Sequence, residues 1–173
     1  MANIKDLLNI PEYDSIRTIL FCAGELSEDE DVKAYVVGGF VRDLLMGKPI
    51  NDIDFMIVGE GIPFAKKLAI KLGTKKIIPF EKFGTAVIPN KKLQIEVATA
   101  RKESYDFNSR KPNKITYTDL NGDLLRRDFT INAMAMDIKP LRFGELNDPF
   151  GGVADIEKKI LRTPLEPDET FSE

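Results

Sequence analysis

The sequence has 173 residues, 43% of them hydrophobic and 31% charged, a composition typical of one globular domain with a substantial core. It contains no histidine and one cysteine, Cys22, which excludes an imidazole base, a His-liganded zinc and an internal disulfide within this chain and fits a reducing cytoplasm. The net charge of −3 conceals a basic stretch, residues 62–115, with 13 Lys or Arg against 4 Asp or Glu, which is either an RNA or phosphate surface or a set of solvated lysines.

Helices and strands alternate along the first part of the chain. Apolar residues at helical spacing, runs of β-branched residues and turn residues between them define the expected elements. In chain order these are a helix over 12–26, a strand over 33–37, a helix over 40–46, a strand over 52–58, a helix over 63–72 ended by Gly73, and strands over 75–80, 85–89 and 93–98.

The second part of the chain is less regular. It predicts a long mobile loop over 101–114, a helix over 123–131, an extended segment over 133–138, a hairpin through 141–146, a helix to residue 159, a short strand over 160–162 and an irregular acidic end. The whole pattern predicts an α+β fold, with a small mixed β-sheet flanked by helices. Its apolar runs are too short to span a bilayer, so no membrane partner is expected.

A glycine pair followed by two closely spaced aspartates is the most informative feature of the sequence. Gly38 and Gly39 open a short helix, and Asp52 and Asp54 lie one residue apart in the next predicted strand. Side chains at i and i+2 of a strand leave the same face, so the two carboxylates project together and shift each other's pKa unless a cation neutralises them. Oxygen ligands suit Mg²⁺, which is commonly held by one or two carboxylates together with substrate phosphates.

Glu96 is a third candidate ligand. It stands in an otherwise apolar strand, where the alternation places its side chain on the face opposite to Ile95 and Val97. Alone, such a carboxylate most often faces solvent, but beside an Asp-x-Asp strand the better interpretation is a third metal ligand. Two-metal phosphoryl transfer needs such a set, because the paired ions activate the attacking oxygen and stabilise the leaving one.

With the downstream element Arg126-Arg127-Asp128-Phe129-Thr130-Ile131-Asn132-Ala133, these residues resemble a known family. The combination is similar to the catalytic head of class II tRNA nucleotidyltransferases, the CCA-adding enzymes, and of the related bacterial poly(A) polymerases, in the DNA-polymerase-β-like superfamily. The resemblance runs from about Tyr35 to the last residue and includes the segments 147–152 and 160–164. It implies a polymerase-β-like palm fold, with a helical segment over 1–30, the head domain over 31–164 and the start of a truncated neck domain over 165–173.

The resemblance also implies roles for the residues before and within the acidic strands. Gly38 and Gly39 would let the backbone approach the triphosphate of ATP or CTP, and Arg42 would contact phosphate. The metal ligands of a two-Mg²⁺ site would be Asp52, Asp54 and Glu96. The residues themselves leave alternatives open: the glycines serve any strand-to-helix turn, and Arg42 pairs instead with Asp43 or Asp52.

For the downstream element the resemblance implies contacts with the nucleotide. Arg127 would contact the triphosphate, Asp128 would accept a hydrogen bond from the ribose 2′-OH, and Asn132 would contact sugar or phosphate. A buried acceptor left unpaired costs ~1–3 kcal/mol, which would favour NTPs over dNTPs. The alternative is a surface cluster of ion pairs on a helix.

Two further expectations concern the loop and the end of the chain. The loop from Arg101 to Pro112 occupies the family's flexible-element position, and its basic residues with Tyr105 and Phe107 would touch an RNA end, unless it is simply a solvated loop. In the family a Glu-Asp-x-x-Arg element of the neck reads the base, and Glu173 matches its first residue. The chain is therefore expected to have metal and triphosphate sites but poor base selection.

The leading hypothesis is a cytoplasmic, template-independent RNA 3′-end nucleotidyltransferase. In this reaction the 3′-OH of an RNA, here a tRNA end, attacks the α-phosphate of an NTP and releases pyrophosphate. CCA addition, A addition and poly(A) synthesis all use this head. Two alternatives remain: a superfamily member that modifies a small molecule, and a nucleotide- or RNA-binding fragment without activity of its own.

Overall fold

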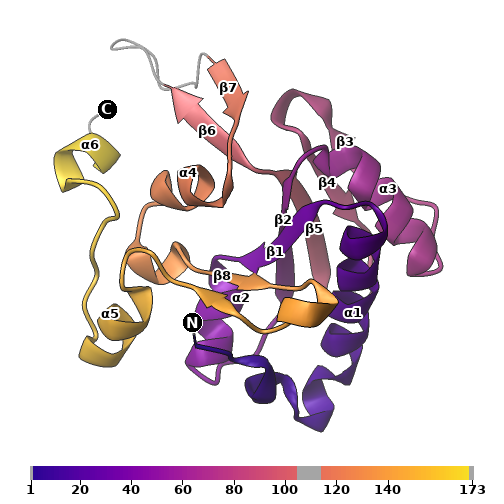
Figure 1. The fold of residues 1–173 in the computed structure, drawn as a ribbon, viewed down its shortest axis with the longest axis horizontal. Helices are drawn as coiled ribbons and strands as arrows, with labels where there is room; N and C mark the ends of the chain where they lie inside the picture. The colour runs from indigo at the N-terminus through magenta and orange to yellow at the C-terminus, as the bar shows by residue number, and fades with distance from the viewer. Residues whose placement is uncertain (1, 105–113, 172–173) are drawn as a thin grey trace.

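A seven-stranded mixed sheet flanked by helices forms the centre of the molecule, as Figure 1 shows. The structure, a computed structural model, describes residues 2–104 and 114–171. The strand order is β3-β4-β5-β2-β1-β8-β9, with β2 and β5 parallel and the other neighbours antiparallel. The expected α+β class with a small mixed sheet is confirmed.

The elements follow one another along the chain with short connections. The strands are β1 (Lys33–Val37), β2 (Asp52–Val58), β3 (Ile78–Phe80), β4 (Thr85–Ile88), β5 (Gln94–Thr99), β6 (Arg101–Ser104), β7 (Lys114–Tyr117), β8 (Ala135–Asp137) and β9 (Leu146–Asn147). The α-helices are α1 (Asp14–Asp29), α2 (Gly39–Leu45), α3 (Gly61–Lys71), α4 (Leu120–Leu125), α5 (Gly152–Lys158) and α6 (Pro167–Phe171). Short 3₁₀ turns lie at Lys5–Leu8, Pro11–Tyr13, Glu81–Phe83, Thr130–Asn132 and Pro140–Arg142. In the described part of the chain, no helix combines the length and the apolarity needed to cross a membrane.

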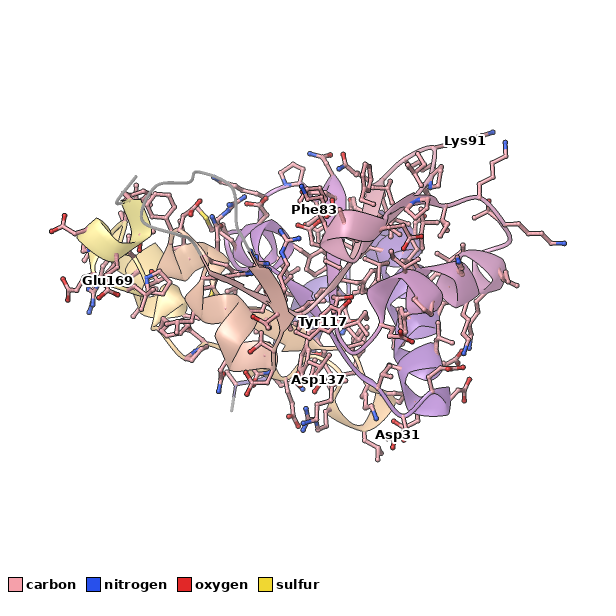
Figure 2. All side chains as sticks on the ribbon, turned by 90° about the horizontal axis from the view of Figure 1, so that it is seen from above. Asp31, Phe83, Lys91, Tyr117, Asp137 and Glu169 are labelled. Carbon is pink, nitrogen blue, oxygen red and sulfur yellow. The ribbon has the colours of Figure 1, made fainter. Side chains whose placement is uncertain are left out.

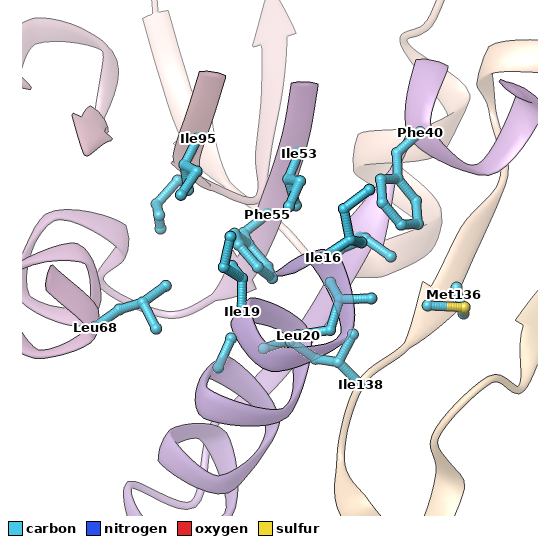
Figure 3. Close-up of a cluster of buried hydrophobic side chains, with 14 of the residues drawn as sticks. Ile16, Ile19, Leu20, Phe40, Ile53, Phe55, Leu68, Ile95, Met136 and Ile138 are labelled. Carbon is cyan, nitrogen blue, oxygen red and sulfur yellow. The ribbon is translucent and has the colours of Figure 1, made fainter. Parts of the chain in front are cut away.

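One face of the sheet is the main hydrophobic core. Figure 3 shows alternate side chains of β2 and β5, among them Ile53, Phe55 and Ile95, meeting apolar side chains of α1 and α3. These residues are essentially inaccessible to solvent, and burying each such side chain contributes roughly 1.5–3 kcal/mol. This packing fixes the positions of β2 and β5, and therefore of the residues that alternate with the core residues.

The opposite face of the same strands is covered only in part. A smaller apolar cluster, which includes Met56 of β2 and Leu124 of α4, closes the half of this face near the carboxyl ends of β2 and β5. Towards the amino ends of the two strands, Asp52, Asp54 and Glu96 are half-buried. The sheet therefore presents carboxylates on a surface whose far side is dry core.

Several expected elements differ from the structure. Residues 101–104 and 114–117 were expected within or next to a loop, but they pair as the antiparallel strands β6 and β7, with Arg101 opposite Tyr117. The expected loop residues Tyr105 and Phe107 lie outside the described residues, as does Glu173. No strand forms over 160–162, and the expected irregular end contains α6.

The predicted helix over 123–131 is wrong at both ends. Helix α4 begins earlier because the Asp119 side chain caps it, accepting a hydrogen bond from the Gly122 amide at 2.9 Å. It ends at Leu125, and the Arg-Arg-Asp segment that follows is irregular up to the 3₁₀ turn Thr130–Asn132. The arginines therefore project from a bend rather than from a regular helix.

Candidate active site

Three carboxylates leave the same face of the sheet. The parallel register of β2 and β5 places Asp54 opposite Glu96, and Asp52 opposite Gln94. Because paired residues in adjacent strands share a face, and residues two apart in one strand do too, the side chains of Asp52, Asp54 and Glu96 lie side by side. The pairing of β2 with β5 brings together three acids that the sequence alone identifies only as separate candidates.

The charge in this group is not balanced. The pKa of Asp54 is raised to about 6, first by burial and then by the neighbouring charges of Asp52 and Glu96, while the Arg127 guanidinium lowers it. Two acids facing one partly buried acid, with one opposing cation, leave excess negative charge. That surplus, on oxygen donors, suits a divalent cation such as Mg²⁺.

The protein does not by itself enclose a metal ion. As the side chains are placed, no group of three or more Asp, Glu or Cys within residues 2–104 and 114–171 converges closely enough to hold one.

The glycine turn lies next to the carboxylates and requires glycine. Gly38 has a φ of +69°, and a Cβ there would lie 2.7 Å from Nη1 of Arg127. The Gly38 amide already donates a hydrogen bond to the Met134 carbonyl at 3.2 Å. A Cβ at Gly39 would lie 3.4 Å from Nη2 of Arg42. The turn thus leaves room for two guanidinium groups beside the backbone.

Arg42 organises this turn through two partners. Its Nε and Nη2 donate to the two carboxylate oxygens of Asp43 at 2.9 and 3.0 Å, and its Nη1 donates to Oδ1 of Asn132 at 2.7 Å. The pairing with Asp43 is the alternative left open by the sequence. The contact joins α2 to the segment that follows Arg127, so Asn132 and Arg42 occupy one site. Their contacts with phosphate or sugar remain predictions.

Asp123 is the functional residue that the sequence interpretation missed. It is 1% exposed, and its Oδ2 accepts from Nη2 of Arg127 at 3.1 Å. Its Oδ1 accepts from Nε and Nη2 of Arg126 at 3.2 and 2.9 Å and from the Arg101 amide at 3.1 Å. An acid three and four residues before two arginines is a recognisable helical pairing, which was the available signal.

Arg127 is held between Asp123 and the glycine turn. Its Nη1 also donates to the Asn132 carbonyl at 3.4 Å, and its Nε is buried without a hydrogen-bond partner among the described residues. A cation fixed in this way beside Asp54 is available to an anionic ligand. Asp128, by contrast, is exposed, so the penalty expected for a buried unpaired acceptor does not apply to it as placed.

A cleft of about 180 Å³ joins the acids to the arginines. It is lined by Val37, Asp54, Phe55, Met56, Thr85, Glu96, Ala98, Arg101, Asp123, Arg126 and Arg127. The carboxylates of Asp54 and Glu96 and the guanidinium groups of Arg101, Arg126 and Arg127 line the same cleft. That is the arrangement required for a polyphosphate whose charge is shared between metal ions and arginines.

The chain is similar to a family model and to solved structures over most of its length. A family model described as the poly A polymerase head domain matches residues 34–162. The A-adding tRNA nucleotidyltransferase of Aquifex aeolicus (strain VF5) is 46% identical over 131 residues, which is 76% of this chain and 16% of that protein.

Two solved structures share the fold. A CCA-adding enzyme in an apo form superimposes with a TM-score of 0.88 at 34% identity, covering 99% of this chain and 40% of that one. A tRNA nucleotidyltransferase complexed with a primer tRNA and an incoming ATP analogue gives a TM-score of 0.72 at 40% identity, covering 83% of this chain and 39% of that one. The chain spans well under half the length of each of these relatives.

Proposed function

The chain belongs to the poly A polymerase head-domain family, and from this premise we propose that it carries the transfer centre of an RNA 3′-end nucleotidyltransferase. The 3′-OH oxygen of the RNA forms a bond to the α-phosphorus of an NTP, the bond from that phosphorus to the bridging oxygen breaks, and pyrophosphate leaves. The single observation that supports this most is the register that aligns Asp54 with Glu96 beside Asp52, facing Arg127.

The three carboxylates are the proposed ligands of Mg²⁺. Their oxygen donors fit that ion, and so does their excess negative charge, which adds to burial in raising the pKa of Asp54. When bound, Mg²⁺ supplies Lewis acidity that favours ionisation of the attacking hydroxyl and stabilises the charge of the leaving pyrophosphate. Asp52, Asp54 and Glu96 would each be ligands.

The arginines of the cleft are the proposed ligands of the phosphates. Arg127, fixed by Asp123, would bind the β- and γ-phosphates, and the Gly38 turn keeps side-chain atoms away from that position. Because these donors are in place before the substrate arrives, little reorganisation accompanies the reaction. Arg42 and Asn132 would add contacts to phosphate or ribose, with Asp128 directed to the 2′-OH.

The relatives support RNA, and in particular tRNA, as the acceptor, with ATP and CTP as donors. One relative is named as an A-adding enzyme, another as a CCA-adding enzyme, and a third was solved with a primer tRNA and an ATP analogue. We also propose that the protein is cytoplasmic, in keeping with its single cysteine. The division at residues 30 and 164 remains part of the proposal.

The test is incorporation of radiolabelled CMP or AMP into a tRNA lacking its terminal nucleotides. The double variant Asp52→Ala/Asp54→Ala should lower incorporation by at least about 100-fold, because the metal ligands are removed. The matched control is Glu12→Ala/Glu157→Ala, which removes two exposed carboxylates away from the sheet face and should leave incorporation unchanged. Equal activity of wild type and the aspartate variant would refute the metal assignment.

A further inference from the structure

An exposed apolar surface lies beside the candidate active site, and no role has been assigned to it above. We call it the aromatic shelf; it consists of Ile78, Phe80, Phe83, Val87 and Tyr117. Ile78, Phe80, Phe83 and Tyr117 are 51%, 46%, 41% and 76% exposed. Large apolar side chains that gather on a surface usually mark a binding site.

The shelf continues the face of the sheet that carries the acids. Asp54 pairs with Glu96, Glu96 with Val87, and Val87 with Ile78, so one ladder runs from the carboxylates to the outer strand β3. Phe80 pairs with Thr85, which lines the cleft. Paired residues share a face, so Ile78, Phe80 and Val87 lie on the face of the sheet that carries Glu96, whereas Ala86 and Ile88 of β4 belong to the core side.

The aromatic part of the shelf is held firmly. Gly84, with a φ of +62°, turns the chain after the 3₁₀ turn Glu81–Phe83, and a Cβ at Gly84 would lie 4.0 Å from Cε1 of Tyr117. The Phe83 carbonyl accepts hydrogen bonds from Nη1 of Arg101 at 3.2 Å and from Oγ1 of Thr85 at 3.3 Å. Phe83 and Tyr117 are both labelled in the central part of Figure 2. Phe83 and Tyr117 are therefore exposed on a hydrogen-bonded turn and on strand β7.

Positive charge accompanies the aromatic rings. Nζ of Lys82 lies 5.7 Å, and Cζ of Arg101 5.8 Å, from the centroid of the Phe83 ring. Arg101 also lines the cleft that contains Asp54 and Glu96. An exposed aromatic ring with cations beside it, as at Phe83, is a combination that binds single-stranded nucleic acid, the ring stacking on a base and the cations meeting phosphates.

The position of the shelf relative to the acids indicates which substrate, the RNA or the NTP, it would contact. In the sheet order, the glycine turn follows β1 on one side of the acids of β2 and β5, whereas Ile78, Phe80 and Val87 of the shelf lie on β3 and β4 on the other side. In phosphoryl transfer the attacking and leaving oxygens are roughly in line, on opposite sides of the phosphorus. If pyrophosphate leaves on the side of Gly38 and Arg127, the attacking 3′-OH arrives from the side of the shelf.

We propose that the aromatic shelf stacks unpaired bases at the 3′ end of the RNA that is extended. This inference depends on the proposed function for the identity of the reaction, but the binding that it describes is measurable without turnover. The competing occupants are the base of the incoming NTP and another part of a longer protein, and the test separates them.

The experiment uses a short single-stranded RNA with 2-aminopurine as its 3′-terminal base, whose fluorescence is quenched by stacking. We compare wild type with Phe83→Ala/Tyr117→Ala, and with Phe83→Trp/Tyr117→Phe, which preserves the rings. The matched control is Leu141→Ala, because Leu141 is 93% exposed and distant in the sequence from the shelf. ATP affinity is measured with each variant, and thermal melts establish that each one is folded.

The alanine double variant should bind the RNA about tenfold more weakly and lose the quenching, as expected for lost base–aromatic stacking, with ATP affinity unchanged. The ring-preserving variant and Leu141→Ala should match wild type. Weaker ATP binding with unchanged RNA binding would overturn the inference and assign the shelf to the incoming base. No effect on either ligand would overturn it in favour of a protein contact.

Failure of the proposed function gives a different result. If wild type quenches 2-aminopurine through the shelf but transfers no nucleotide to any RNA, the transfer reaction is wrong while the shelf remains an RNA site. If wild type transfers nucleotides and the alanine variant raises neither the KM for RNA nor the dissociation constant, the shelf inference alone fails.

Discussion

The two faces of the central sheet have opposite chemistry although they are built from the same strands. Ile53 and Phe55 of β2 belong to the dry core, and Asp52 and Asp54, alternating with them, leave the opposite face, where Asp54 lines the cleft. The core side gains stability from each side chain it buries, whereas the cleft side holds Asp54, whose pKa is raised first by burial and then by the charges of Asp52 and Glu96. The first face therefore stabilises the strand whose second face carries the proposed metal ligands, where a buried carboxylate lowers stability.

The largest effect on stability is expected on the core face. Phe55→Ala should lower the free energy of unfolding by about 3–5 kcal/mol, since Phe55 is 1% exposed and its loss leaves a cavity. Urea denaturation of wild type and variant checks this. The exposed Phe171→Ala serves as the control, and a Phe55 variant as stable as that control would contradict the division into two faces.

The buried carboxylate of the cleft side should affect both stability and binding. Asp123→Asn removes the carboxylate that pairs with both Arg126 and Arg127, which should cost about 2–3 kcal/mol, less than a fully buried pair because the two arginines are partly exposed. Because Arg127 loses its anchor, the KM for ATP should rise about tenfold.

Asp137→Asn is the matched control for that change. Asp137 is equally buried and is paired with Arg142 at 2.9 Å through Nε, but it lies on β8 and does not line the cleft. It should lower stability to a similar extent and leave the KM for ATP unchanged. If both variants raise the KM alike, Asp123 acts only through stability.

How far the sequence predicts this site depends on the distance between partners. The i, i+2 spacing of Asp52 and Asp54 and the alternation around Glu96 placed each acid on the correct face. The pairing of Asp54 with Glu96 joins strands separated by 35 residues or more, and no local pattern encodes such a register. The β6–β7 pair was missed for a different reason: residues 101–104 are polar throughout, so no apolar alternation marks them as a strand.

A smaller effect, of opposite sign, is expected for Asp54 itself. Its pKa is raised from 3.8 to about 6, so the folded state holds the proton more tightly than the unfolded state. The associated stability is present below about pH 4 and is lost as the pH rises through about 6. In metal-free buffer, Asp54→Asn should therefore be more stable than wild type by about 2 kcal/mol at pH 7.5, and by much less at pH 4.5.

Thermal melts in EDTA at the two pH values test this prediction. Glu157→Gln, an exposed carboxylate on α5, is the control and should show no such pH dependence. A destabilised Asp54→Asn at pH 7.5 would mean that Asp54 makes favourable contacts that outweigh its repulsion from Asp52 and Glu96. The cleft face would then not be destabilised by Asp54, as the comparison of the two faces requires.

The smallest predicted effect concerns the contact between α1 and the sheet. A Cβ at Gly24 would lie 2.1 Å from the Ile138 carbonyl oxygen, so Gly24→Ala should force α1 away from the sheet. The expected cost is about 1–2 kcal/mol, because the better helix propensity of alanine offsets part of the strain. Gly47→Ala is the control for a steric clash, because the added Cβ there meets no atom within 4 Å. Its positive φ still makes alanine unfavourable at that position. Equal melting of wild type and Gly24→Ala would contradict the close packing.

Calorimetric titration with ATP, with and without Mg²⁺, tests most directly whether the acidic face is a metal-dependent triphosphate site. Wild type should bind ATP in Mg²⁺ and only weakly in EDTA, because the carboxylates repel the bare triphosphate. Asp54→Asn should lose most of the gain from Mg²⁺ and bind bare ATP better than wild type does. Equal binding of ATP by wild type with and without Mg²⁺, or an unchanged Mg²⁺ dependence in Asp54→Asn, would contradict the assignment of Asp52, Asp54 and Glu96.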